Sequence, residues 1–369
     1  MKNKPRVLVV GAGLTGASAA RVLAERGCYV EVHEARSVVG GLAHDFTNET
    51  GRVHKYGPHV FHTNNDSVWN FLSRFQLFTN YEHTIQACTY DGTLINVPIT
   101  LDFINATFGP EAVDLIVKTC PSRFPLKAIS ESIPEVYQWF VDNLVLSEAW
   151  IIEYGGIGSL PVCLNGDRRF YDAKHQGVPC IGYTNMVQRM LCHADIKIKH
   201  NTPYRDHEGF DGVVYTGPID EFFNYSEGKL LFHSVVTTRS NVAGPTKSRI
   251  ESPVVELCYE SNYHRISNIN RLGYDRYEPN QPTFYLDRLV DFNGSNDRWY
   301  PMRSDTSHTI YNKYVEMSTD PNIIFAGWLG RFKYISMDQA VQQGIDSAIA
   351  IFDFLSSNHD LGSTQKSAT

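Results

Sequence analysis

The chain opens with short apolar runs separated by glycines, in the order strand, helix, strand. Residues 6–10, RVLVV, form a β-branched run that ends in a glycine-rich turn. Residues 17–26 follow with apolar positions at helical spacing, and residues 28–34, CYVEVHE, again have a strand-like pattern. This order predicts the first βαβ unit of a doubly wound α/β fold.

After the first unit, one helix and a strand hairpin precede a region, from about 100 to 150, where the pattern becomes helical. Asparagine and aspartate at 64–66 precede apolar positions at helical intervals, which predicts a capped helix. Residues 85–98 have the pattern of two strands around Asp91-Gly92, a dipeptide that suits a tight hairpin turn. Amphipathic stretches then follow at 101–109, 111–120 and 134–145, and they predict an inserted helical lobe.

Strand-like runs dominate the second half of the chain. Glycines, prolines and polar residues cluster in 153–179, which predicts a long functional loop, and strand patterns follow from 196 to 290. A strand and a glycine turn then lead into a helix at Ser336, which is placed with Gln339 as a capping box. The end of the chain is polar and small, and we expect residues 359–369 to be disordered.

Composition places the chain among mildly acidic globular proteins. Its 369 residues are 42% hydrophobic and 20% charged with a net charge of −7, so global charge gives no support for a nucleic-acid partner. Seven scattered cysteines without CxxC spacing favour a reducing, cytoplasmic location and argue against a zinc site. The N-terminus has the outline of a signal peptide, but glycines interrupt its apolar part, and no apolar run has the length of a membrane span.

A dinucleotide-binding fingerprint lies between the first strand and the first helix. Gly11, Gly13 and Gly16 have GxGxxG spacing, which permits the turn, lets a pyrophosphate approach the backbone and allows close packing of helix on strand. Glu34 lies at the end of the second strand, where it can accept hydrogen bonds from a ribose. These residues leave both FAD and NAD open.

Two further features favour FAD. A second glycine pair, Gly40 and Gly41, follows the acid closely. The strand, glycine turn and capped helix at the C-terminus could aim the positive end of the helix at a flavin ring and stabilise its reduced, anionic form. Both features are typical of flavoproteins whose first and last segments build one cofactor domain.

Three histidines crowd into residues 54–65, HKYGPHVFHTNN. His59 and His62 are three positions apart, but no predicted helix aligns them and no acidic motif such as HExxH accompanies them. We therefore expect no metal here. A neutral imidazole can donate or accept a hydrogen bond, so a role beside a cofactor is the better interpretation.

In the order of its motifs, the chain resembles the flavin-dependent UDP-galactopyranose mutase family. The matching stretches cover nearly the whole chain: GAGLTGASAARVL, VHEARSVVGG, HKYGPHVFHTN, LFTN, HQGVPCIGYTNMVQRML, VVYTGPIDEFF, RWYPM and GWLGRFKYISMDQAV. The resemblance implies an α/β fold with a Rossmann-like FAD-binding domain built from discontinuous segments, an inserted helical domain and a six-stranded antiparallel sheet domain. The implied FAD-binding domain covers 1–80, about 205–235 and 315–358. The implied helical domain covers about 100–155, and the implied sheet domain covers about 81–99, 156–204 and 236–314.

The resemblance also implies an activity. Family enzymes interconvert the pyranose and furanose forms of a nucleotide-linked sugar without net redox change. N5 of reduced FAD attacks the anomeric carbon and expels the nucleoside diphosphate; the covalent adduct opens as an iminium, the ring recloses, and the diphosphate returns. Because the cofactor is the nucleophile, the protein mainly orients it. NAD(P)H is the implied external reductant, and a homodimer is the implied assembly.

Site residues carry over from the resemblance by position. The implied cofactor-binding residues are Gly11, Gly13, Gly16, Glu34, Arg36, Gly40, Gly41, His59, His62, Thr216, Gly217, Gly327 and Met337. The implied substrate-binding residues are Asn80, Trp150, Arg168, Tyr183, Arg265, Tyr300 and Tyr334. His59 and His62 would flank the flavin ring and support catalysis together with Arg265, whereas His54 is expected to be structural. Arginine offers paired donors to a diphosphate, although Tyr300 and Trp150 are also typical core aromatics.

Three positions depart from the family pattern. Val145 stands where the family has a tyrosine that stacks on uracil, Cys163 stands at the mobile-loop arginine, and Trp328 stands at a C-terminal arginine. Arg168 and Arg169 lie near Cys163 in the sequence, and Arg331 follows Trp328 closely. Conversion of UDP-galactopyranose to UDP-galactofuranose is the first expectation, and the departures favour UDP-arabinopyranose or a TDP- or GDP-linked sugar as alternatives. A flavin oxidoreductase and a non-catalytic binder of nucleotide sugars also stay open.

Overall fold

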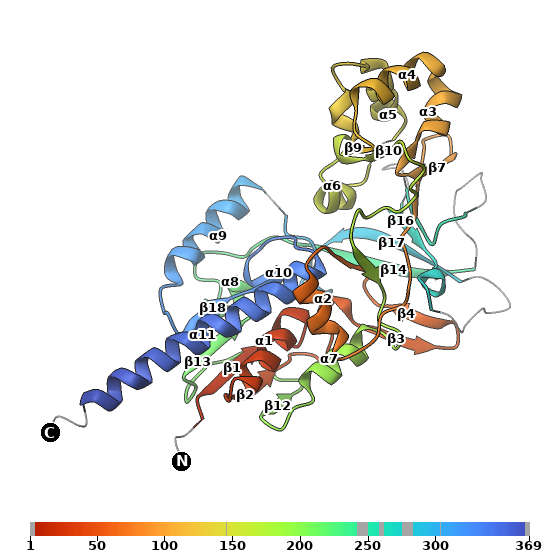
Figure 1. Ribbon diagram of the computed structural model, residues 1–369. Coiled ribbons are helices and arrows are strands. Elements are labelled where there is room, and N and C mark those ends of the chain that lie inside the picture. Colours follow the sequence, from red (N-terminus) through yellow and green to blue (C-terminus); the bar gives the residue numbers. More distant parts are fainter. Residues whose placement is uncertain are drawn as a thin grey trace.

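The computed structural model describes residues 4–144, 146–241, 250–257, 262–274, 283–302 and 304–365, with side chains described through residue 357. A parallel sheet, a mixed sheet and a helical lobe make up most of this chain (Figure 1). No helix in these ranges is long and apolar enough to cross a membrane. Val145, expected at the base-stacking position, lies outside them.

The N-terminal segment forms the centre of a five-stranded parallel sheet. The strand order is β12 (Ile196–Lys199), β2 (Tyr29–His33), β1 (Arg6–Val10), β13 (Gly212–Tyr215) and β18 (Ile323–Phe325). Apolar residues of α1 (Leu14–Glu25), α7 (Tyr183–Leu191) and α11 (Met337–Gln365) share one buried core with the valines of β1 and β2. The predicted βαβ opening is confirmed, and segments from the beginning, middle and end of the chain meet in one sheet.

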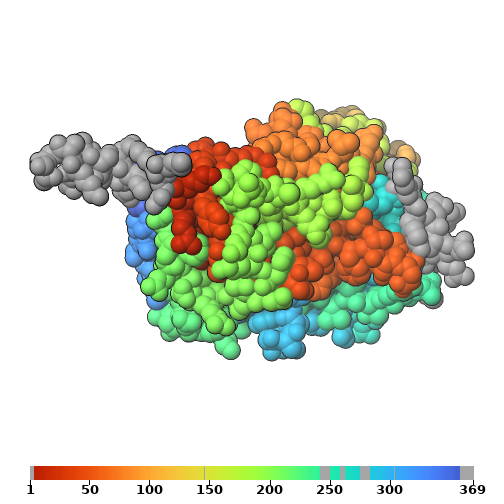
Figure 2. Space-filling model, turned by 90° about the horizontal axis from the view of Figure 1, so that it is seen from below, coloured from red at the N-terminus to blue at the C-terminus, as the bar shows by residue number. Residues whose placement is uncertain are grey.

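Helix α7 and strand β12 pack with the parallel sheet, whereas the resemblance assigns residues 156–204 to the domain of the six-stranded sheet. Helix α7 packs against α1, and β12 pairs in parallel with β2, with Ile196 opposite Val30. The space-filling view shows the green surface of this region beside the red N-terminal surface (Figure 2). The alternating IKIK sequence of β12 indicates an edge strand, but it carries no information about which sheet the strand joins.

The six-stranded sheet is mixed and not antiparallel. Its strand order is β14 (His233–Ser240), β17 (Phe284–Asp291), β16 (Arg265–Ser267), β15 (Val254–Glu256), β6 (Ile85–Cys88) and β7 (Leu94–Val97). Four neighbouring pairs are antiparallel, but β15 and β6 run parallel, with Val254 opposite Ile85. A tight turn such as Asp91-Gly92 forces β6 and β7 to be antiparallel. No turn joins β6 to β15, so their direction is free.

The helical lobe stands beyond one end of the mixed sheet (Figure 1). It contains α3 (Leu101–Phe108), α4 (Pro110–Thr119), α5 (Pro134–Asn143) and α6 (Glu148–Tyr154), with a small sheet of β8 (Ile99–Thr100), β10 (Pro161–Cys163) and β9 (Arg123–Pro125). The three predicted amphipathic stretches correspond to α3, α4 and α5. Apolar residues of the lobe share a buried core with β6, β7 and β15, which fixes the lobe to the sheet.

Short elements connect these layers. The predicted helix after the histidines is α2 (Asp66–Ser73), and the Asn65 side chain caps it by accepting hydrogen bonds from two backbone N–H groups. Two ribbons pair β3 (Asp45–Asn48) with β4 (Gly51–His54) and β5 (Phe61–Thr63) with β11 (His175–Gly177). The remaining helices are α8 (Ile219–Phe222), α9 (Asp305–Met317) and α10 (Gly327–Gly330).

The C-terminal helix is capped in part as expected and is longer than expected. The backbone N–H of Ser336 donates to Oε1 of Gln339 at 3.2 Å, which is one arm of a capping box. The hydroxyl of Ser336 donates to Asp338 instead of accepting from the helix. Helix α11 continues to Gln365, so residues 359–365 are helical and not disordered, while 366–369 lie outside the described residues.

Candidate active site

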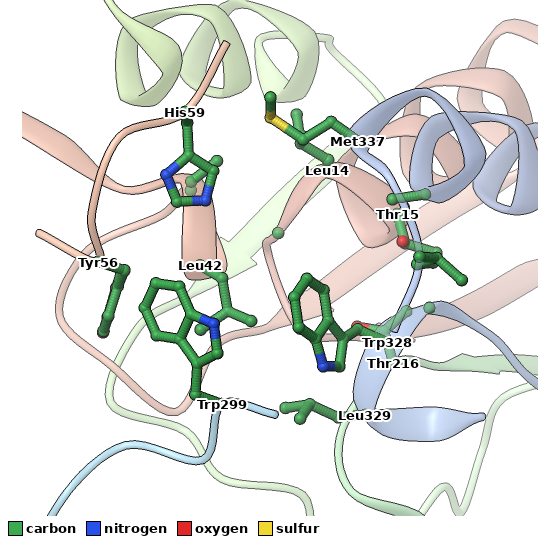
Figure 3. Close-up of a pocket in the computed structure, with 18 of the residues that line it drawn as sticks. Leu14, Thr15, Leu42, Tyr56, His59, Thr216, Trp299, Trp328, Leu329 and Met337 are labelled. Carbon is green, nitrogen blue, oxygen red and sulfur yellow. The ribbon is translucent and has the colours of Figure 1, made fainter. Parts of the chain in front are cut away.

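A cavity of about 350 Å³ lies between the carboxyl ends of the parallel strands and the mixed sheet. Figure 3 shows it in close-up. Ligands of open α/β sheets bind at this end of the strands. Its wall brings together most of the expected residues: Gly11, Gly13, Glu34, Arg36, Gly40, Gly41, His59, His62, Thr216, Gly217, Arg265, Tyr300, Gly327, Tyr334 and Met337. In Figure 3 the rings of His59, Trp299 and Trp328 surround a common space.

Two glycines at the turn after β1, Gly11 and Gly16, have no room for a side chain. Gly11 has a φ of +97°, and a Cβ atom there would lie 2.3 Å from Oγ1 of Thr216. A Cβ atom on Gly16 would lie 1.9 Å from the carbonyl oxygen of Gly11. Gly16 therefore lies behind the cavity wall and allows α1 to approach the turn, whereas Gly11 and Gly13 form the wall itself.

Glu34 ties the end of β2 to this turn. Its carboxylate is buried and accepts hydrogen bonds from the backbone N–H of Ala12 at 2.8 Å and of Arg36 at 3.0 Å. These bonds orient the carboxylate at the cavity wall. Its contact with a ribose stays a prediction.

The histidine stretch divides into a structural part and a cavity-lining part. His54 is buried, its Nε2 lies 3.0 Å from the hydroxyl of Tyr274, and its Nδ1 accepts from the N–H of His59. His59 and His62 both line the cavity, and burial lowers the pKa of each below its ordinary value. Both imidazoles are therefore neutral near pH 7. No group of three or more possible metal ligands occurs among the described residues.

A buried ionic cluster surrounds Arg265 on β16. Its Nε lies 2.7 Å from Oε1 of Glu256, and its Nη2 lies 2.8 Å from Oε2 of Glu153. The hydroxyl of Tyr300 donates to the other oxygen of Glu153. Asp287 lies opposite Arg265 on β17 and accepts a hydrogen bond from Thr237 at 2.6 Å. One arginine thus faces three carboxyl groups.

Burial dominates the ionisation of this cluster. It raises the pKa of Glu256 to about 7 and that of Asp287 to about 6, although Arg265 opposes both shifts. Burial also raises the pKa of the Tyr300 and Tyr334 phenols, which therefore act as neutral hydrogen-bond donors. The end of the cavity nearest Arg265 can bind charge, donate hydrogen bonds and hold protons near neutral pH.

Comparison with known proteins identifies the family. The family model described as UDP-galactopyranose mutase matches residues 146–334, which is more than half of the 369-residue chain. The chain belongs to the UDP-galactopyranose mutase family. A second model, described as an NAD(P)-binding Rossmann-like domain, matches residues 9–75 and so covers the glycine turn.

Relatives of this mutase-family protein match over nearly their full length. A probable UDP-galactopyranose mutase from Klebsiella pneumoniae is 28% identical over 96% of each chain. A dTDP-fucopyranose mutase from Escherichia coli is also 28% identical, over 93% of this chain and 97% of its own. A crystal structure of reduced UDP-galactopyranose mutase has the same fold, with a TM-score of 0.65 at 15% identity over 95% and 96% of the two chains.

The cavity fits the FAD on which isomerases of this family depend. Trp299 is 4% exposed and lines the cavity, and its Nε1 donor has no hydrogen-bond partner among the described residues; the same is true of Nε1 of Trp328. Buried donors left unpaired at a cavity wall are expected where a ligand accepts their hydrogen bonds. The glycine turn also lines the cavity, and helix α1 begins directly after it at Leu14, so the positive end of the helix lies where a pyrophosphate would bind.

Four expected substrate residues do not line the cavity. Asn80 and Arg168 are exposed to solvent. Trp150 is buried behind Tyr154, with ring centres 4.5 Å apart, and Tyr183 is buried with its hydroxyl donating to the carbonyl of His59. Any effect of Trp150 or Tyr183 on a ligand in this mutase-family protein therefore passes through the residues in front of it.

The departures at Cys163 and Trp328 have different structural consequences. Cys163 is buried, and its Sγ lies 3.1 Å from Nη1 of Arg123. Nη2 of Arg123 donates to the backbone carbonyls of Arg169 and Phe170. Arg123 thus anchors the loop that follows Cys163. Trp328 lines the cavity, with its ring centre 4.6 Å from that of Tyr334, whereas Arg331 is exposed and does not replace the missing arginine there.

Several cavity residues lie outside the expected set: Leu42, Tyr56, His83, Glu153, Tyr154, Tyr171, Glu256 and Trp299. Two of them carried a signal in the sequence. Glu256 interrupts the apolar run VVEL, and acids in such runs are rarely buried unless they are paired. Trp299 precedes Tyr300 in the RWYP motif. Glu153 lies in a short helix with no distinctive motif, and its place beside Arg265 depends on how the lobe packs on the sheet.

Proposed function

We propose that this protein interconverts the pyranose and furanose forms of a sugar linked to a nucleoside diphosphate. One observation supports the proposal most strongly. A single cavity unites the glycine turn, the histidine pair His59 and His62, and the group formed by Arg265, Tyr300 and Tyr334. These groups suit a dinucleotide cofactor at one end and an anionic, hydroxyl-rich substrate at the other.

The chain's own residues would hold and orient the cofactor. The turn at Gly11 and Gly13 would receive the FAD pyrophosphate, and Glu34 the ribose. His59 offers a ring, and Trp299 offers a donor without a partner among the described residues, at the part of the cavity wall where the flavin ring would lie. When bound and reduced, FAD supplies the nucleophile for the ring contraction, and NAD(P)H is the proposed reductant.

The part of the cavity nearest Arg265 would hold the substrate. Arg265 and the hydroxyls of Tyr300 and Tyr334 would bind the diphosphate and keep it close after it leaves the sugar. The aromatic wall formed by Tyr154, Tyr171 and Tyr334 would exclude water that could trap an opened sugar. His59 and His62, neutral near pH 7, would contribute hydrogen bonds without adding charge.

UDP-galactopyranose is the first substrate that we propose, and a dTDP-linked sugar is the second. The two named relatives carry different nucleotides in their names and are equally similar to this chain at 28% identity. Trp328 and Cys163 remove two expected arginines from the region of the diphosphate, which favours a binding mode that differs from the family pattern.

The test uses the purified protein with its flavin reduced by dithionite. It is incubated with UDP-galactopyranose, UDP-arabinopyranose, dTDP-fucopyranose, dTDP-galactopyranose and a GDP-linked hexose, and furanose products are separated by chromatography. A furanose from one of these supports the proposal and names the substrate. Absence of any product while the reduced flavin remains bound contradicts it.

The same samples discriminate the other functions. Bleaching of oxidised flavin by a substrate under anaerobic conditions would identify an oxidoreductase. Nucleotide-sugar binding without a furanose product would identify a binding protein. Arg331→Ala removes the charge of an exposed arginine and is the control for Arg265→Ala, the variant that removes the proposed diphosphate ligand. Light scattering after gel filtration tests the proposed homodimer, and cell fractionation tests the proposed cytoplasmic location.

A further inference from the structure

The donors that should hold the substrate are already hydrogen-bonded to the protein. Glu153 accepts from Nη2 of Arg265 at 2.8 Å and from the hydroxyl of Tyr300. Arg265 and Tyr300 are two of the three residues to which the diphosphate is assigned above. The side chains of Arg265 and Glu153 are 7% and 8% exposed, so water competes little for these bonds. The carboxylate of Glu153 thus uses the hydrogen bonds that a phosphate group would need.

We propose that Glu153 is an internal counter-ion of Arg265 that an anionic group of the substrate displaces, with uptake of a proton by the surrounding carboxyl cluster. The inference rests on the proposed function and adds a requirement to it. A diphosphate cannot use Arg265 unless Glu153 gives up that bond.

The cluster around Arg265 carries excess carboxyl groups before any ligand binds. Arg265 faces Glu153, Glu256 and Asp287, so the cluster is already acidic. Oε2 of Glu256 and Oδ2 of Asp287 are buried and have no hydrogen-bond partner among the described residues. Two further negative charges on a diphosphate would be repelled strongly at such a site. Binding is favourable only if the cluster loses negative charge, and a proton from solvent on a carboxylate is the direct means.

Among the described residues, the groups near Arg265 do not supply a compensating charge. The titratable groups that the structure describes around Arg265 are Glu153 and Tyr154 from α6, Glu256 from β15, Asp287 from β17, and His59, His62, His83, Tyr171, His264, Tyr300 and Tyr334 from loops and strands around the cavity. Burial lowers the pKa of the histidines and raises that of the tyrosines, so these side chains are neutral near pH 7. Protons must therefore go to the carboxyl groups.

Glu153 is the carboxylate that can move. Glu256 and Asp287 belong to strands β15 and β17, where ladder pairing on either side of Arg265 holds them. Glu153 lies in the last turn of the short helix α6, which is followed by Gly155 and Gly156, both with a φ of +89°. Consecutive glycines permit backbone changes that other residues resist. A small rotation at this helix end would free Arg265 without disturbing the sheet.

The test measures proton uptake by the oxidised holoenzyme, which binds without turnover. Calorimetric titrations with UDP-galactose and dTDP-galactose at pH 8 are repeated in buffers of different ionisation enthalpy. Neither ligand has a titrating phosphate proton near this pH, so the exchanged protons belong to the protein. We expect uptake of about one proton per ligand, with affinity that falls by up to about tenfold per pH unit above neutrality.

Glu153→Gln removes the charge and keeps the shape. It should bind the same ligand about tenfold more tightly at pH 8, with little proton uptake, which corresponds to about 1.4 kcal/mol. Glu153→Asp keeps the charge and should retain proton uptake. Glu135→Gln, an exposed change in the same lobe, should behave as wild type. Flavin absorbance and melting temperature show that each variant is folded.

Two results overturn the inference and differ in meaning. If UDP-galactose or dTDP-galactose binds wild type without proton uptake, or binds Glu153→Gln no more tightly than wild type, the counter-ion role is wrong and the mutase proposal stands. If neither nucleotide sugar binds wild type or the variant, and no furanose forms from any sugar tested, the proposed function fails as well.

Discussion

The imidazole ring of His62 stacks on the phenol ring of Tyr171, with ring centres 3.6 Å apart and planes inclined by 15°. Both residues line the main cavity and also a second hollow that includes Asn64, Asp172 and Asp338. The stacked pair therefore lies between the two. Tyr171 belongs to the loop that Arg123 anchors, which connects the position of this loop to closure of the cavity.

Tyr171→Ala should open the cavity to water and lower kcat/KM by about 10- to 100-fold, because an ordered aromatic wall is lost. Tyr171→Phe keeps the stack on His62 and removes only the hydroxyl, which hydrogen-bonds to Tyr154. We expect it to remain within a few-fold of wild type, since one such bond contributes about 1 kcal/mol. Steady-state kinetics on the sugar identified above provide the measurement. Equal losses in both variants would show that the hydroxyl, and not the ring, is important.

Gly11→Ala should abolish flavin binding. A Cβ atom there would lie 2.3 Å from Oγ1 of Thr216, on a residue with a φ of +97°. Gly27→Ala is a matched control, because Gly27 has a φ of +93° but a Cβ atom on it would have no neighbour within 4 Å. It should cost about 1 kcal/mol in stability and retain flavin. The ratio of absorbance at flavin and protein wavelengths distinguishes the two, and flavin retention in Gly11→Ala would contradict the assignment of the turn.

Much of the cofactor side of this site is predictable from sequence because its signals are local. The spacing of Gly11, Gly13 and Gly16 encodes a turn whose sterics the structure confirms, and Asn65 caps the helix that its sequence predicts. The substrate side is less predictable. Glu153 and Arg265 are 112 positions apart in the chain, and they meet only because the helical lobe packs on the mixed sheet. No short-range pattern encodes such a meeting.

The errors in the fold have the same origin. Strand β12 joins the parallel sheet and β6 pairs in parallel with β15, although neither pairing has a turn that would reveal it. A strand's residues indicate burial and edge position, but its partner is fixed by the packing of the whole domain. Trp150 and Tyr183 illustrate this for the site, since their aromatic character is equally consistent with a core position, which is where they lie.

Arg123→Ala should release the loop after Cys163. The guanidinium contacts Sγ of Cys163 and the carbonyls of Arg169 and Phe170, so its loss removes the only side-chain hydrogen bonds that the structure shows to these three groups within the described residues. We expect cleavage in this loop by limited proteolysis to be faster by about tenfold, in line with the loss of roughly 1.4 kcal/mol of local stability. Arg205→Ala, at an exposed arginine, serves as the control. Unchanged cleavage would show that the loop is held by other contacts.

Arg265→Ala should abolish turnover while the flavin stays bound, because Arg265 lies at the substrate end of the cavity and not at the glycine turn. It also leaves Glu153 and Glu256 buried without their partner, which typically destabilises a protein by about 3–5 kcal/mol. Arg265→Lys restores the charge but not the fork of donors, and should recover stability more than activity. Product assays and urea unfolding measure the two effects. Residual turnover close to wild type in Arg265→Ala would exclude Arg265 as the diphosphate ligand.

Glu256 should make the protein less stable as the pH rises through the neutral range. Burial raises its pKa from 4.5 to about 7 in the folded state. Between these values the folded state binds more protons than the unfolded state, so the free energy of unfolding decreases with increasing pH. The stabilisation is complete below pH 4.5 and is lost by pH 7, and it is on the order of 3 kcal/mol.

Glu256→Gln isolates this contribution. The amide does not titrate, so the pH-dependent decrease due to this residue should disappear, whereas Asp287, whose pKa is raised to about 6, continues to titrate in both proteins. Urea unfolding of wild type and Glu256→Gln from about pH 4.5 to 8 should give curves that diverge by about 3 kcal/mol across this range, whatever their absolute offset. The exposed change Glu135→Gln should leave the wild-type slope intact. Parallel curves for wild type and Glu256→Gln would mean that Arg265 keeps Glu256 ionised throughout, and that the proton taken up on ligand binding must go to another carboxyl group of the cluster.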